Sequence, residues 1–125
     1  KDLIPLCGGY KDPEKEKVFI MGGPMMGVSV PSDDIIVTKT VTSIIILNKT
    51  DYKEEPCVRC GSCVLSCPVH LEPVQIMNAV KTLDKPRIKM LNPLRCIECG
   101  LCSYTCTSKI PVTDYIRKAK IIAKL

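Results

Sequence analysis

Residues 57–68 read CVRCGSCVLSCP, and residues 96–107 repeat the same spacing as CIECGLCSYTCT. In each segment three cysteines lie three residues apart, and a fourth follows four residues later. This C-x2-C-x2-C-x3-C spacing is typical of ligands to 4Fe-4S clusters. Steps of three residues curl the loop so that successive sulfurs converge. Gly61, between two ligands, lets backbone N–H groups approach the inorganic sulfides.

The fourth cysteine of such a run ligates the other cluster when two clusters are present. We therefore predict crossed ligation. One cluster takes Cys57, Cys60, Cys63 and Cys106, and the other takes Cys96, Cys99, Cys102 and Cys67. Each half of the repeat then contributes to both clusters, so we expect this domain not to fold without iron and sulfide.

Structural zinc is the non-redox alternative for the eight thiols. Zinc ribbons pair two C-x2-C knuckles across a longer spacer, so a triplet plus a fourth cysteine fits them poorly. A secreted disulfide scaffold would also be rich in cysteine. Eight of the nine cysteines, however, fall into two short segments whose spacing is typical of metal ligands rather than of disulfide partners. We therefore expect a reducing, cytoplasmic compartment.

Composition narrows the remaining functional classes. The 125 residues are 46% hydrophobic and 25% charged, which suits one or two small globular modules. The formal net charge of +5 falls to about +1 once two clusters of about −2 each are counted. With one Phe, four Tyr and no Trp, the chain is not expected to bind nucleic acid.

The sequence contains no triad of Ser, His and Asp, no paired catalytic carboxylates and no nicotinamide or flavin fingerprint, so we assign no catalytic residue. Its apolar runs are far shorter than a bilayer span, and we expect no transmembrane segment in the chain.

The composition changes near residue 50, which divides the chain into residues 1–50 and 51–125. The first part carries β-branched runs that predict strands at 18–21, 35–38 and 43–47, after the end of a helix at residues 2–7 that Gly8 and Gly9 stop. It reads as an incomplete β-rich module. Residues 48–56 are polar and predict a linker. The second part is predicted to be mainly helical, which makes the fold class α+β.

The second part contains an internal repeat with a period of 39 residues, which predicts a pseudo-two-fold arrangement. After the first quartet Pro73 begins a predicted helix that ends at 84–86. After the second, Pro111 precedes a predicted carboxy-terminal helix. The expected buried stripes are Ile76, Met77, Val80 and Leu83 in the first helix, and Val112, Ile116, Ala119 and Ile122 or Ala123 in the second.

Four other features have plain structural interpretations. Cys7, outside both quartets, is predicted to be a small buried hydrophobe, and His70 a solvated loop residue. Residues 22–27, GGPMMG, lack the pattern of a phosphate-binding loop and predict a turn with two packed methionines. The basic face of the last helix is interpreted as solvated rather than as a docking site for a membrane or an acidic partner; it comprises Arg117, Lys118, Lys120 and Lys124.

The chain resembles the C subunit of the Rnf family of ion-translocating ferredoxin:NAD oxidoreductases. The resemblance runs the whole length and is carried by residues 21–27, 57–63, 96–104, 108–111 and 115–120. It implies a partial β-grasp module of the soluble-ligand-binding type for residues 1–50, followed by a helical ferredoxin domain with two clusters. It also implies a relay of single electrons between a flavin and NAD(H) site and partner subunits.

The same resemblance implies that FMN and NAD(H) bind in a larger upstream domain that this sequence lacks. It implies a peripheral position on the cytoplasmic face of a bacterial or archaeal membrane, with the other subunits of the complex as partners. The corrinoid reductase of bacterial microcompartments shares the architecture and is the related alternative.

One residue departs from the family pattern. Thr107 stands where a proline usually follows the fourth cysteine. Because threonine supplies an N–H and a hydroxyl that proline lacks, we expect a modest change in the potential of the cluster bound by Cys106.

Overall fold

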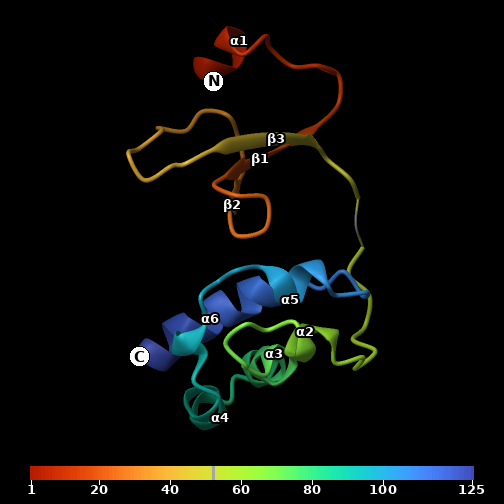
Figure 1. The fold of residues 1–125 in the computed structure, drawn as a ribbon, viewed down its shortest axis with the longest axis vertical. Helices are drawn as coiled ribbons and strands as arrows, with labels where there is room; N and C mark the ends of the chain where they lie inside the picture. Colours follow the sequence, from red (N-terminus) through yellow and green to blue (C-terminus); the bar gives the residue numbers. More distant parts are fainter. Residues whose placement is uncertain (52) are drawn as a thin grey trace. The chain divides into compact units, whose positions relative to one another are not determined.

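The computed structural model describes residues 1–51 and 53–125 (Figure 1). The chain forms two compact units, Lys1–Asp51 and Tyr52–Leu125. The first contains helix α1 and strands β1 to β3, and the second contains the remaining helices. Among the described residues, no helix is long and apolar enough to cross a membrane.

The first unit is built on a three-stranded antiparallel sheet in the order β2-β1-β3. The strands are β1 (Lys17–Met21), β2 (Val28–Val30) and β3 (Ile44–Asn48), and α1 (Leu3–Leu6) precedes them. Phe19 of the central strand pairs with Val30 and Ile46, and its ring meets Tyr10 edge-on with centroids 6.4 Å apart. The structure describes every residue of this unit, and none of them is buried.

Several expectations for the first unit were wrong. Residues 35–38 form no strand and pair with none of the three strands of the sheet, and Ile36 is 84% exposed. The three-residue strand β2 was not expected. Cys7 is exposed rather than buried, because α1 is a single turn that buries no residue.

The predicted turn at residues 22–27 is present, but its methionines are exposed. Met25 and Met26 are 39% and 59% exposed. The close contact in this turn is made by Gly27 instead. A Cβ at Gly27 would lie 2.5 Å from Gly23 O and 2.5 Å from Ile20 Cγ2. The turn therefore needs glycine where the chain packs back on β1.

The second unit has its core between two helices, α3 (Pro73–Lys81) and α6 (Val112–Lys124). The remaining elements are α2 (Ser62–Leu65), α4 (Lys85–Met90), the 3-10 turn η1 (Pro93–Arg95) and α5 (Leu101–Tyr104). The predicted stripes are confirmed at their centres. Ile76, Met77, Ile116 and Ala119 are at most 1% exposed, and Ile88 of α4 joins them.

The end of the first predicted stripe was wrong. Leu83 is 72% exposed and has a φ of 55°, because α3 ends at Lys81 and the chain turns there. The segment 84–86, expected only to stop a helix, also begins one. Asp84 Oδ1 accepts a hydrogen bond of 3.1 Å from the Arg87 N–H and thereby caps α4.

Candidate metal centres

The two cysteine loops have the same backbone conformation at matching positions. Gly61 and Gly100 lie in the left-handed region at φ 78° and 80°, immediately before α2 and α5. Two residues earlier Arg59 and Glu98 have φ values of 55° and 56°. Positive φ is costly for residues other than glycine and is retained where surrounding structure requires it. Each loop therefore curls twice between its first and third cysteines.

The first loop lines a cavity of about 330 Å³. Its thiols are those of Cys57, Cys60, Cys63 and Cys106. The apolar part of the wall comes from α3 and α6 and from the segment before α6, through Val74, Met77, Ile110 and Val112. The first triplet thus shares its cavity with the fourth cysteine of the second run.

The second loop lines a smaller cavity of about 20 Å³. Its thiols are those of Cys67, Cys96, Cys99 and Cys102, with Leu71, Pro73, Ile97 and Ile116 beside them. This space is much smaller than that beside the first loop. Four thiols are the donor set of a 4Fe-4S cluster, and the donor sets of both cavities fit one.

Hydrogen bonds between the two runs bring the fourth cysteines to opposite cavities. The Ser108 hydroxyl donates to Pro56 O at 3.0 Å, and the Glu55 N–H donates to Ser108 O at 3.0 Å. These bonds hold the chain after Cys106 against the residue before Cys57. The hydroxyls of Ser66 and Thr105, which precede the two fourth cysteines, lie 3.2 Å apart.

The eight cysteines differ in exposure. Cys57 and Cys60 are exposed, Cys102 is buried, and the other five are half-buried. Among the described residues, no three His, Cys, Asp or Glu side chains are arranged to hold a single metal ion. His70 is exposed, as predicted.

Burial and hydrogen bonding change the acidity of three of these thiols. Burial raises the pKa of Cys63 and of Cys102, because the thiolate loses hydration. The hydroxyl of Ser62, 3.4 Å from Cys60 Sγ, lowers the pKa of Cys60. Metal ligands must be deprotonated, so ligation at Cys63 and Cys102 has to displace a proton that burial favours.

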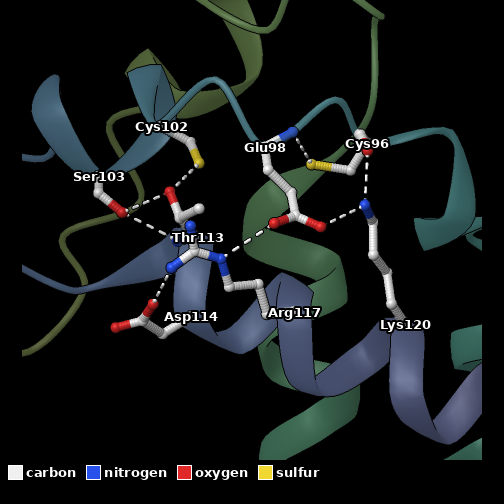
Figure 2. Close-up of polar contacts among 8 residues, drawn as sticks. All are labelled: Cys96, Glu98, Cys102, Ser103, Thr113, Asp114, Arg117 and Lys120. Atoms are coloured by element: carbon white, nitrogen blue, oxygen red, sulfur yellow. Dashed lines mark hydrogen bonds and ion pairs between the residues drawn. The ribbon is translucent and has the colours of Figure 1, made fainter. Parts of the chain in front are cut away.

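Two thiols of the second cavity accept hydrogen bonds from backbone N–H groups, and a third lies beside a hydroxyl. The Leu71 N–H donates to Cys67 Sγ and the Glu98 N–H to Cys96 Sγ, each at 3.3 Å. Cys102 Sγ lies 3.4 Å from the hydroxyl of Thr113 (Figure 2). Such contacts adjust the potential of an iron–sulfur centre.

The second loop is also attached to α6 by ion pairs (Figure 2). Glu98 accepts from Lys120 at 2.6 Å and from Arg117 at 3.1 Å. Lys120 donates in addition to Cys96 O at 2.7 Å. The Lys120 hydrogen bond is the largest of the effects that lower the pKa of Glu98. The interpretation of the α6 basic face as wholly solvated was therefore wrong for Arg117 and Lys120.

Comparisons with known proteins identify a domain type and several relatives. The family model for a 4Fe-4S dicluster domain matches residues 56–110. The C subunit of an ion-translocating oxidoreductase complex from Buchnera aphidicola is 35% identical over 108 residues, which is 83% of this chain. A protein of the same name from Actinobacillus succinogenes is 38% identical over 123 residues, or 95% of this chain.

The chain belongs to the C-subunit family of ion-translocating oxidoreductase complexes. Another relative is the C subunit of the proton-translocating ferredoxin:NAD(+) oxidoreductase complex of Clostridium ljungdahlii, 45% identical over 76 residues and 58% of this chain. The chain spans only 23%, 17% and 16% of the lengths of these three relatives.

Sequence reasoning did not identify the polar residues that support the cysteines in this C-subunit segment. Ser103 and Thr113 were not singled out, and neither was Glu98. Their partners lie 10 to 22 residues away along the chain. The 39-residue repeat does offer a signal, because Thr113 and Ser103 replace Val74 and Val64 at matching positions.

Proposed function

We propose that this chain binds two 4Fe-4S clusters by crossed ligation and relays single electrons within an ion-translocating oxidoreductase complex. Cys57, Cys60, Cys63 and Cys106 would hold one cluster. Cys67, Cys96, Cys99 and Cys102 would hold the other. The observation that carries the proposal is the lining of the two cavities, each by three cysteines of one run and the fourth of the other.

Bound clusters supply one-electron chemistry, and the chain's own residues provide ligation, burial and orientation. Val74, Met77 and Val112 form an apolar wall at the first cavity. The hydrogen bonds of Ser108 with Glu55 and Pro56 keep Cys106 beside the first three cysteines. Exposure of Cys57 and Cys60 leaves the first site accessible to a redox partner.

The wider setting follows from the relatives and is part of the proposal. We infer that the partners are the other subunits of the complex, on the cytoplasmic face of the membrane. We infer that FMN and NAD(H) bind elsewhere in the same subunit. Within the chain we propose a partial β-grasp module at residues 1–50 and a pseudo-two-fold ferredoxin domain at residues 51–125. The antiparallel sheet and the matching φ values in the two cysteine loops support this division.

Anaerobic purification with iron and acid-labile sulfide analysis tests the proposal. We expect a brown protein with about eight irons and eight sulfides per chain and two EPR-active centres after reduction. Cys67→Ser and Cys106→Ser should each affect the cluster of the opposite triplet, and Cys7→Ser is the matched control that should retain both. A colourless protein that contains zinc would overturn the proposal.

A further inference from the structure

A pair of hydroxyls adjoins one ligand of the second cavity and has no counterpart at the matching positions of the first. Thr113 Oγ1 lies 3.4 Å from Cys102 Sγ and 2.8 Å from Ser103 Oγ (Figure 2). The Thr113 N–H donates to Ser103 Oγ at 2.8 Å. Thr113 is only 6% exposed and Cys102 8%, so water competes little for these bonds.

Ligation fixes the direction of every proton in this group. A cysteine that binds iron is a thiolate, which can only accept hydrogen bonds. The Thr113 hydroxyl therefore donates to Cys102. Since its own proton is used, Thr113 Oγ1 accepts from the Ser103 hydroxyl, and Ser103 Oγ accepts from the Thr113 N–H. The geometry leaves one consistent arrangement, with Thr113 as the donor to sulfur.

The first half of the repeat has no hydroxyl at these two positions. Val64 and Val74 stand 39 residues before Ser103 and Thr113. Val74 lines the first cavity and has no hydroxyl to offer the Cys63 thiol. At Cys102 a side-chain hydroxyl lies beside the sulfur, while the Thr113 N–H donates to Ser103. The two cavities are therefore chemically unequal at matching ligands.

We propose that Thr113, oriented by Ser103, raises the reduction potential of the cluster held by Cys67, Cys96, Cys99 and Cys102. The inference rests on the proposed function. One electron changes the total charge of a cluster and its four thiolates from about −2 to −3. A donor at a thiolate stabilises the more negative state more strongly, and burial strengthens the effect. Thr113 thus makes the two clusters distinguishable, and Ser103 is the positioning residue that orients its hydroxyl.

Redox-titrated EPR on the anaerobically purified holoprotein tests this inference, with dithionite as the electron donor, itself oxidised to sulfite. Thr113→Val keeps the shape and removes the hydroxyl. It should lower one midpoint potential by about 59 mV, a tenfold change in the reduction equilibrium constant. Thr113→Ser should restore the wild-type value. Ser103→Ala keeps the Thr113 hydroxyl but removes the group that orients it. It should lower the same potential by less than Thr113→Val does, which is a change of less than tenfold in the reduction equilibrium constant.

Thr82→Val is the matched control, because the Thr82 hydroxyl bonds only to the carbonyls of Asn78 and Ala79 within α3. It should leave both potentials unchanged. Three results would overturn this inference and leave the proposed function standing. They are equal potentials in wild type and Thr113→Val, an equal shift of the potentials of both clusters in Thr113→Val, and a Thr113→Ser potential as low as that of Thr113→Val. A wild-type protein without two EPR-active clusters would overturn the proposed function as well.

Discussion

Replacing Ile116 by alanine should open the second metal centre more than the first. Ile116 lies on α6, is 1% exposed and lines the cavity of Cys67, Cys96, Cys99 and Cys102. The substitution removes three buried carbon atoms at about 0.8 kcal/mol each, or about 2.4 kcal/mol. The cavity left behind raises the cost towards about 4 kcal/mol, within the range for such truncations.

That cost should be visible as faster loss of iron. With about 1.4 kcal/mol per factor of ten, the open state becomes about 50-fold to 700-fold more populated. The assay is the rate at which an iron chelator extracts iron anaerobically from the holoprotein. We expect two phases, with half of the iron released by the accelerated one. Ile116→Val should accelerate iron release only about 2- to 12-fold, because a buried Ile→Val substitution costs about 0.5–1.5 kcal/mol.

Ile121→Ala provides the control on the same helix, because Ile121 is 64% exposed. Ile121→Ala should change the free energy of opening the second centre by no more than about 0.5 kcal/mol. If iron left Ile116→Ala no faster than Ile121→Ala, the packing of α6 would not support the second centre and the reasoning would be wrong.

Three further predictions concern the supporting residues. Glu98→Gln should weaken the attachment of the second loop by about 1 kcal/mol, because the carboxylate is partly exposed. The rate of iron release should then rise about fivefold at low salt. Arg59→Gln, at the matching position of the first loop, should change this rate little. Equal rates of iron release from the two variants would refute the role of Glu98. Thr107→Pro should lower the potential of the cluster bound by Cys106 only, since Thr107 lines the first cavity and proline removes both its N–H and its hydroxyl; unchanged midpoint potentials would argue against it. Gly27→Ala should destabilise the first unit by about 1–3 kcal/mol, because its Cβ would lie 2.5 Å from Gly23 O. Hydrogen exchange of the β1 amides should accelerate roughly 5- to 140-fold in Gly27→Ala and scarcely in Gly23→Ala, whose Cβ would meet only the flexible Met26 side chain.

The cysteine spacing was readable from the sequence because it is a local property. Ligands three residues apart need only one loop, and Gly61 and Gly100 mark the left-handed positions that curl it. The buried stripe of Ile76 and Met77 was readable for the same reason, since helical periodicity acts over a few residues.

The support of the second loop was not readable, because it depends on how α6 packs across the chain. Lys120 reaches Cys96 O and Glu98 over more than 20 residues, and periodicity alone made it one of several solvated lysines. Leu83 fitted the apolar stripe, but the helix ends two residues before it. The strand error at residues 35–38 arose because β-branched composition does not determine which segments find pairing partners.

Crossed ligation is the central claim, and anomalous diffraction at the iron absorption edge tests it most directly. Crystals of the anaerobically purified protein should show two iron clusters. One should lie within bonding distance of Cys57, Cys60, Cys63 and Cys106, and the other next to Cys67, Cys96, Cys99 and Cys102. A cluster bound by Cys57, Cys60, Cys63 and Cys67, all from one run, would contradict the account.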